Sequence, residues 1–337
     1  MGSLTPIPEI RALRGNMAGR VRIAVDKAAG GRNLGCITKR GAIMGLRGVI
    51  LGSLLGLITL PLAGQAGEQV ITFDVAGGKV VGTLSLPDGG PAPVVVLFHG
   101  FTGSRDELAV ANTDDGVFSR TARLLAEAGY ASLRIDFRGS GESDGAFMDT
   151  TFEGQVADGL AAVALMTADP RVKGRDLAII GWSQGGLVAT AVAGRSGIPD
   201  AVALWEAVAT PKQTFAGLLG ADILAKGLTA GDTPVQITLP WGAQIALKQG
   251  YFEGVASFDP AKEIAAYKGP VFVTQGTLDT TVLPADADLL IAAHDGPEQL
   301  WTAEMDHVFN AFTGPETLDK MVAATITFFD ANIAKTP

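Results

Sequence analysis

The sequence predicts an α/β protein with a doubly wound, mostly parallel sheet and one inserted subdomain. Short, continuously apolar runs such as residues 93–100 are typical of strands that are buried on both faces. Segments with helical periodicity alternate with these runs over short connections, which favours a parallel sheet with helices on both sides. Residues 209–268 interrupt the alternation, because they contain no clear strand. We therefore expect one domain over residues 67–337, with a lid inserted at about 209–268.

Each element is expected from its own pattern, in chain order. The runs 69–75 and 79–86 alternate as strands do and flank a short glycine-containing turn, which predicts a hairpin. Residues 115–129 carry their apolar side chains on one helical stripe, and Gly129 is a candidate for the end of this helix. The remaining strands are expected at 93–100, 131–137, 176–182, 201–208, 270–276 and 298–304. The remaining helices are expected at 153–168, 184–194 and 316–333.

Residues 1–66 differ from the rest of the chain and predict a leader. They carry a net charge of +7, against −16 for the remainder. Basic residues precede the apolar run 49–62, and Gly64 and Ala66 then stand at the −3 and −1 positions of a cleavage site. This run of 14 residues is shorter than the about 20 that a membrane span needs. We expect a cleaved signal peptide, a translation start at Met44, with Met17 as the alternative start, and export of the protein; membrane anchorage by residues 49–62 is the alternative to cleavage.

Composition argues against several classes of function. The chain of 337 residues has a net charge of −9, and its acidic body is a poor match for nucleic-acid phosphates. Cys36 is the only cysteine and lies in the leader, so we expect no disulfide in the exported protein. No cluster of histidine, cysteine and acidic residues has the spacing of a metal site. We expect a small-molecule substrate, no metal, no cofactor and no stable membrane span after cleavage, while the oligomeric state stays open, a dimer included.

The stretch GWSQGG, at residues 181–186, carries the strongest chemical signal. It follows an expected buried strand and opens an expected helix, so Ser183 lies at a corner that can project its hydroxyl above the sheet. Gly181 and Gly185 remove the side chains that would clash in so tight a turn. The following helix aims its N-terminal N–H groups at the point where negative charge would develop. Ser183 is therefore predicted to be a nucleophile.

A serine nucleophile needs a base, and the base needs a carboxylate. Asp279 follows one expected strand and His307 follows the next, which gives the chain order serine, acid, histidine. Because each of the three follows the carboxyl end of a strand, we expect them to meet at one edge of the sheet. The N–H groups of Phe101 and Gln184 are the expected oxyanion donors.

Other titratable residues are expected to have structural roles or to be weaker candidates. Asp306 and Asp295 are alternative acids, but Asp306 adjoins His307 in sequence and would struggle to face it. His99 is expected to hold the oxyanion loop by hydrogen bonds rather than to act as a base. His294 is expected to be a surface residue on a helix.

Five motifs in order resemble the α/β-hydrolase superfamily: HGFTGS, RIDFRGSGESDG, GWSQGG, GTLDTTV and DHVF. With the insertion between the sixth and seventh core strands, the chain is most similar to the cinnamoyl (feruloyl) esterase group. It departs from that group at Trp182, where histidine is usual, and at Arg138, where asparagine is frequent. The resemblance implies an α/β-hydrolase fold from about residue 70 to 333 and a serine esterase activity.

We expect a serine carboxylic ester hydrolase that acts through an acyl-enzyme on short-chain or hydroxycinnamoyl esters. Trp182 and the lid residues Trp241, Tyr251 and Phe252 are candidate substrate contacts, because rigid aromatic walls suit a planar ring. A serine peptidase or a thioesterase with the same residues is the first alternative. A non-catalytic binding module is the second, although such modules usually lose one member of the triad and none is missing here.

Overall fold

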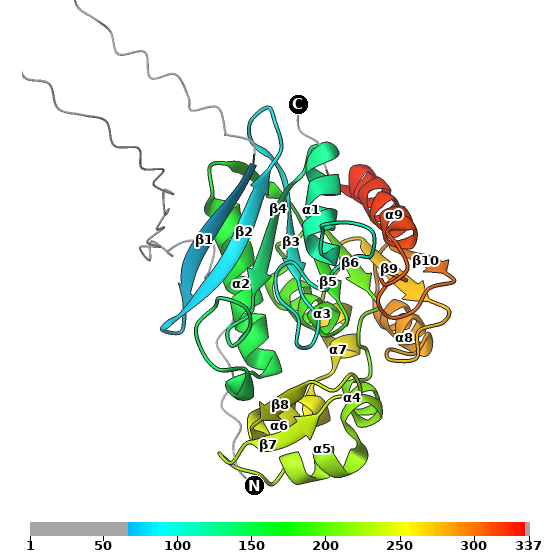
Figure 1. The fold of residues 1–337 in the computed structure, drawn as a ribbon. Helices are drawn as coiled ribbons and strands as arrows, with labels where there is room; N and C mark the ends of the chain where they lie inside the picture. The colour runs from blue at the N-terminus through cyan, green and yellow to red at the C-terminus, as the bar shows by residue number, and fades with distance from the viewer. Residues whose placement is uncertain (1–66, 334–337) are drawn as a thin grey trace, which may run out of the picture.

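The computed structural model describes residues 67–333, which form a central sheet of eight strands (Figure 1). The strand order is β1-β2-β4-β3-β5-β6-β9-β10. The first two pairings in this order are antiparallel and the others are parallel, so the predicted mostly parallel, doubly wound sheet is confirmed. The strands are β1 (Gly67–Val75), β2 (Gly78–Leu86), β3 (Ala92–Phe98), β4 (Ala131–Asp136), β5 (Val172–Trp182), β6 (Ala201–Trp205), β9 (Val271–Gly276) and β10 (Glu298–Ala303).

The hairpin predicted at the start of the sheet is present. Ala76 and Gly77 join β1 to β2, and both residues have a positive φ, 48° and 83°. Two successive residues at positive φ form the type I′ turn, whose twist matches that of the flanking strands. In the second half of β1, buried and more exposed residues alternate, because one face of this edge strand stays open to solvent.

Helices cover both faces of the sheet, and two apolar cores lie between helices and strands. The core helices are α1 (Val117–Glu127), α2 (Phe152–Ala168), α3 (Gln184–Ser196), α8 (Ala285–Ala293) and α9 (Glu316–Asn332). Helices α2, α3 and α8 pack on one face, and α1 and α9 pack on the other. Alternate side chains of β3 enter opposite cores: Val94, Val96 and Phe98 enter one, Val95 and Leu97 the other. This two-sided burial explains why the β3 sequence is continuously apolar.

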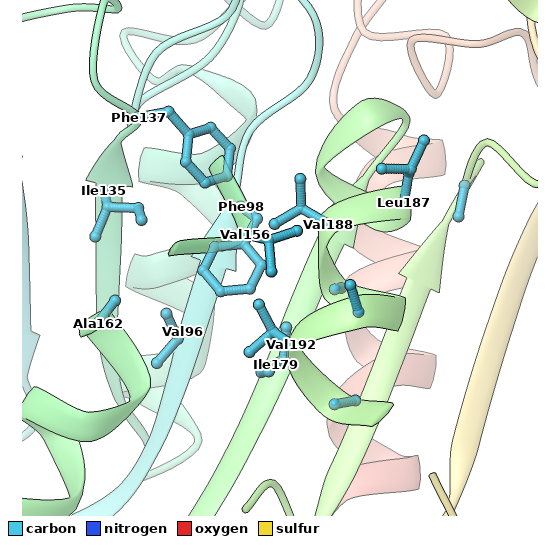
Figure 2. Packing of buried hydrophobic residues seen from close by; sticks show 14 of the residues in the cluster. Val96, Phe98, Ile135, Phe137, Val156, Ala162, Ile179, Leu187, Val188 and Val192 are labelled. Carbon is cyan, nitrogen blue, oxygen red and sulfur yellow. The ribbon is translucent and has the colours of Figure 1, made fainter. Parts of the chain in front are cut away.

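Figure 2 shows the first of these cores at the level of α3. Phe98 lies beside Phe137, Val156 and Val188, and its ring centroid is 5.7 Å from that of Phe137. Gly159 of α2 lets this helix approach closely, because a Cβ there would lie 3.0 Å from the Phe98 ring. Tight packing here fixes α2 and α3 on the sheet, and α3 begins directly after Ser183.

The chain between β6 and β9 forms a separate group of short elements at one end of the sheet (Figure 1). The group consists of α4 (Pro211–Leu219), α5 (Ala221–Gly227), β7 (Val235–Thr238), β8 (Gln244–Leu247) and α6 (Gln249–Ser257). The last helix of this stretch, α7 (Pro260–Ala265), packs instead against α3 and α8. The expectation of no strand in this insertion was wrong, because β7 and β8 pair antiparallel. Each has four residues, and such short strands give little periodicity in the sequence. A lid function for the insertion stays a prediction.

Two further expectations were wrong in detail. The predicted strand 201–208 ends at Trp205, because Glu206 takes a φ of 45° that no strand residue adopts. His294 was expected on the surface, but it follows α8 and is buried, with its ring stacked on Tyr267 at 6.0 Å. The apolar pattern of α8 does not show that this helix packs against α7, next to which Tyr267 covers the His294 ring.

Between residues 67 and 333, no helix has both the length and the apolar character that a membrane crossing requires. In the same part of the chain, no group of histidine, cysteine and acidic side chains could hold a metal ion. The predicted signal peptide, the Met44 start and the alternative anchor at 49–62 lie outside the described residues.

Candidate active site

Ser183 occupies the sharp corner between β5 and α3. Its backbone has φ 55° and ψ −118°, a conformation that L residues rarely adopt. The corner is held from several sides. The Ser183 N–H donates to the Trp205 carbonyl at 2.9 Å, and the Ser183 carbonyl accepts from Gly186 at 3.0 Å and Val208 at 3.2 Å. A strained residue persists only where its surroundings fix it in this way, and such residues are typical of functional sites.

Close backbone approach explains the glycines on either side of Ser183. A Cβ on Gly185 would lie 2.0 Å from the Phe98 carbonyl oxygen, and a Cβ on Gly181 would lie 2.4 Å from the Gly185 carbonyl oxygen. Neither glycine has a positive φ, so their role here is space rather than conformational freedom. The start of α3 therefore rests directly on the end of β3, and this contact sets the position of Ser183.

Three predicted residues come together at the carboxyl edge of the sheet. His307 Nε2 lies 3.0 Å from Ser183 Oγ, and His307 Nδ1 lies 2.7 Å from Asp279 Oδ2. Asp279 follows β9, and His307 lies in the loop after β10. The Asp279 carboxylate is buried, and its Oδ1 accepts N–H groups from Thr281 at 2.7 Å and Val282 at 3.0 Å. These bonds fix the carboxylate so that Oδ2 faces the imidazole.

The loop that carries His307 is braced from beneath by Trp182. The Trp182 indole N–H donates to the His307 carbonyl at 3.2 Å, and its ring lies 4.9 Å from that of Phe309. The Asp306 carboxylate accepts the N–H groups of Val308 and Asn310 at 3.1 and 2.8 Å, whereas the imidazole Nδ1 is bonded to Asp279. The weaker case for Asp306 as the acid therefore has a structural reason: its carboxylate caps the turn.

The loop after β3 presents the first expected oxyanion donor. Among the described residues, no acceptor is bound to the backbone N–H of Phe101 or of Gln184. His99 holds this loop as expected: its Nδ1–H donates to the Gly100 carbonyl at 2.8 Å, and its Nε2 accepts from the Phe137 N–H at 3.1 Å. Burial lowers the pKa of His99 to about 4, so its ring is neutral at pH 7 and one nitrogen can accept.

Two acidic residues near the site were not singled out from the sequence. The Glu107 carboxyl accepts the Gly100 N–H at 2.6 Å beneath the oxyanion loop, and burial raises its pKa to about 8. Glu206 follows β6, is fully buried and accepts the Gly276 N–H on both oxygens, at 2.8 and 2.9 Å. Burial, with the Asp279 carboxylate nearby, raises the pKa of Glu206 well above its usual value.

Glu206 therefore stays protonated at pH 7, because two adjacent buried carboxyl groups cannot both carry a charge cheaply. A sequence signal was available, since Glu206 is an acid at the carboxyl end of a core strand, the same kind of position as that of Asp279.

The four candidate substrate contacts have different positions. Trp182 is buried under the histidine loop, and Phe252 is buried against Gly227, whose added Cβ would lie 2.2 Å from the ring. Trp241 is 58% exposed in the turn between β7 and β8. Tyr251 alone of the four contacts an expected oxyanion residue by its side chain: its hydroxyl donates to Gln184 Oε1 at 2.7 Å.

A cluster of aromatic rings surrounds Tyr251 at the seam between insertion and sheet. Its ring lies 5.6 Å from Phe101, 5.2 Å from Phe152 and 5.6 Å from Phe215. Beside it, a cavity of about 410 Å³ lies between the turn Phe147–Asp149 and the insertion. Its lining includes the charged side chains Asp149, Asp232, Lys248 and Glu253. The seam thus has an apolar side and a charged side.

Comparison with known proteins shows which fold this architecture belongs to. Residues 93–210 match the family model described as the alpha/beta hydrolase fold. Est1E from Butyrivibrio proteoclasticus, solved with ferulic acid bound, is similar with a TM-score of 0.63 and 24% identity over 78% of this chain and 99% of that one. An acetyl xylan esterase from Paenibacillus sp. R4 gives a TM-score of 0.59 and 17% identity, over 79% of this chain and 84% of that one.

An esterase from Pyrococcus furiosus is also similar, with a TM-score of 0.60 and 19% identity over 80% of this chain and 92% of that one. A search of curated proteins gives no significant sequence match. The predicted α/β-hydrolase fold is confirmed, and the resemblance to esterases of that fold is confirmed at the level of structure. The family model ends before Asp279 and His307, so the hydrogen-bonded trio is seen only in the folded chain.

Proposed function

We propose that this chain, which has the α/β-hydrolase fold, is a serine carboxylic ester hydrolase that acts through an acyl-enzyme. The observation that carries the proposal is the chain of contacts from Ser183 Oγ to His307 Nε2 at 3.0 Å and from His307 Nδ1 to Asp279 at 2.7 Å. A nucleophile within hydrogen-bond reach of a base, with that base oriented by a carboxylate, is the arrangement that activates a serine.

In the proposed first step, Ser183 Oγ attacks the ester carbonyl carbon while its proton passes to His307 Nε2. Asp279 accepts the Nδ1–H of the imidazole, which selects the tautomer with a free Nε2 and stabilises the imidazolium that forms. The carbonyl oxygen becomes an oxyanion between the N–H groups of Phe101 and Gln184. Removal of one such donor costs about 10²–10³ in kcat in a well-studied protease.

The tetrahedral intermediate then collapses, and the C–O bond to the alcohol breaks. The leaving alcohol takes its proton from His307, which leaves the acyl group on Ser183. Water attacks the acyl carbon in the second half, gives its proton to His307 and forms a second oxyanion at the same two N–H groups. Collapse releases the carboxylic acid and returns the proton to Ser183 Oγ, so no cofactor is consumed.

We further propose that the acyl group is compact, either short aliphatic or aryl. Phe101 lies beside Tyr251 and Phe215 at 5.6 and 5.5 Å, so rings crowd the expected oxyanion side. Aromatic contact favours a planar ring by about 0.5–1.5 kcal/mol beyond burial. The similar Est1E was solved with ferulic acid, which agrees with this choice of acyl class.

A substrate panel tests the activity together with Ser183→Ala. The panel contains methyl ferulate, p-nitrophenyl butyrate, p-nitrophenyl palmitate, a thioester and an aminoacyl anilide. We expect kcat/KM to be highest for ferulate or butyrate, and Ser183→Ala to lose about 10⁶ in kcat. Ser132→Ala, which changes a buried serine of β4, is the matched control and should retain activity.

Each other outcome contradicts a stated part of the proposal. Palmitate as the best substrate contradicts the compact acyl site, and preference for the thioester or the anilide favours a thioesterase or a peptidase. A wild-type protein that hydrolyses none of the five compounds favours a binding module. Residual activity above a few per cent in Ser183→Ala excludes Ser183 as the nucleophile.

A further inference from the structure

One residue of the insertion contacts both segments that carry the expected oxyanion donors. Tyr251 lies on α6 and is fully buried. Its hydroxyl donates to Gln184 Oε1 at 2.7 Å, and its ring lies 5.6 Å from the ring of Phe101. Phe101 belongs to the loop after β3, while Gln184 is the first residue of α3. The two N–H groups therefore come from different elements, and Tyr251 bridges their side chains.

The hydroxyl of Tyr251 begins a directed chain of buried hydrogen bonds. Gln184 Nε2 donates to Gln155 Oε1 at 2.7 Å, and Gln155 Nε2 donates to Thr150 Oγ1 at 3.3 Å. The chain connects α6 of the insertion to α3, then to α2 and to the loop before α2. Both amide groups of this chain are buried, so a lost partner cannot be replaced by bulk water.

We infer that Tyr251 is a positioning residue that couples docking of the insertion to the spacing of the two oxyanion donors. This inference rests on the proposed function. The hydroxyl fixes the Gln184 side chain and with it the first turn of α3, and the ring fixes Phe101. The insertion then contributes to the rate by holding the N–H groups of Phe101 and Gln184 at the separation that a tetrahedral oxyanion requires.

The backbone around these donors depends on such external support. Ser183 and Thr102 both have a positive φ, 55° and 62°, so neither corner adopts its shape by local preference. Gln184 follows one of them and Phe101 precedes the other. Displacement of catalytic groups by about 1 Å can cost on the order of 100-fold in rate, so a small relaxation here is measurable.

Tyr251→Phe and Tyr267→Phe form a matched pair of variants. Tyr267 is also buried, and its hydroxyl makes one hydrogen bond, to the Pro199 carbonyl at 3.0 Å, outside the site. Each variant removes one oxygen and one buried bond, so both should lose a few degrees of Tm. We expect Tyr251→Phe to lower kcat by about 5- to 100-fold with KM within about threefold, and Tyr267→Phe to keep kcat within about twofold.

Two further measurements separate positioning from other roles. Gln184→Leu keeps the backbone donor but removes the side-chain acceptor, so the double variant with Tyr251→Phe should lose no more kcat than the larger single loss. Amide hydrogen exchange of residues 184–188, in the first turn of α3, should accelerate in Tyr251→Phe and not in Tyr267→Phe, whether or not the protein hydrolyses esters.

The results that would overturn the role of Tyr251 differ from the results that would overturn the proposed esterase function. An active wild type with an unchanged kcat in Tyr251→Phe overturns the inference alone, as do equal kcat losses in both tyrosine variants. A change confined to KM makes Tyr251 a substrate contact and also overturns it. If the wild type hydrolyses no ester, unchanged exchange at residues 184–188 in Tyr251→Phe still overturns the coupling between the insertion and the first turn of α3.

Discussion

Replacing Glu206 by glutamine should leave the protein nearly as stable and as active as the wild type at pH 7, whereas leucine should not. Glu206 is fully buried, accepts the Gly276 N–H on both oxygens and has the Asp279 carboxylate as a charged neighbour. Because its pKa is raised, the group that folds into this site is a neutral acid. Glutamine is also neutral and supplies the same acceptor and donor, so Glu206→Gln should change the free energy of unfolding by less than about 1 kcal/mol.

Glu206→Leu removes both functions of the carboxyl group. The Gly276 N–H would lose its acceptor, and an unpaired buried donor costs about 1–3 kcal/mol. One kcal/mol corresponds to about 2–4 °C of Tm for a domain of this size, so the expected loss is about 2–12 °C. Asp279 would also lose a neighbour that fixes its carboxylate, and kcat should fall.

The pH dependence gives the sharper comparison. A carboxyl group with a raised pKa in the folded state stays protonated while the unfolded chain ionises above its ordinary value of 4.5. The folded state then binds more protons, so this group makes the protein less stable as the pH rises above 4.5. Glutamine does not titrate, so the stability of Glu206→Gln relative to the wild type should increase from pH 5 to pH 9.

Urea unfolding of both proteins at pH 5, 7 and 9 measures this difference, since every other titrating group is shared. Parallel curves for the two proteins would refute the assignment of a neutral carboxyl. So would a Glu206→Gln variant as unstable as Glu206→Leu at pH 7, because a charged carboxylate is not replaced by an amide.

Three other predictions concern the corner, the oxyanion loop and the leader. Gly185→Ala should destabilise the fold by at least about 2 kcal/mol and abolish activity, because its Cβ would lie 2.0 Å from the Phe98 carbonyl oxygen; Gly217→Ala on α4, with nothing within 4 Å, is the control and should not destabilise. Because the pKa of His99 is lowered to about 4, the unfolded chain takes up this proton first, and the free energy of unfolding should fall by up to about 3 kcal/mol as the pH falls from 6.5 to 4. If the urea midpoint of His99→Gln falls as much over this pH range as that of the wild type, the prediction is wrong. We propose that the protein is exported with Gly67 as its first residue, and the intact mass of secreted material checks this; retention of residues 49–62 in a membrane fraction favours the anchor instead.

The sequence was sufficient for the parts of the molecule that follow a general rule. Ser183, Asp279 and His307 were predicted to meet because each follows the carboxyl end of a strand, and the hydrogen bonds among them agree. The apolar run of β3 predicted a strand buried on both faces, and its side chains do alternate between two cores. Such patterns depend only on local periodicity and on parallel pairing.

Parts that depend on tertiary contact could not be predicted in the same way. Tyr251 and Trp241 are both aromatic residues of the insertion, yet one is fully buried and the other is 58% exposed. Which of them faces the sheet is decided by how α6 packs on Phe152 and Phe215, and no local pattern records that packing. Glu206 was not predicted, because a single acid within an apolar run gives no spacing signal. Its position directly after β6 was the one signal that the sequence offered for it.

The central claim is that Ser183 is the nucleophile, and reaction with a fluorophosphonate tests it most directly. An activated serine oxygen displaces fluoride and forms a stable bond to phosphorus, so the mass of the protein increases by one phosphonyl group. The account predicts a single adduct in the wild type, mapped to the peptide that contains Ser183, and no adduct in Ser183→Ala. An unlabelled wild type, or an equal adduct in Ser183→Ala, would contradict it.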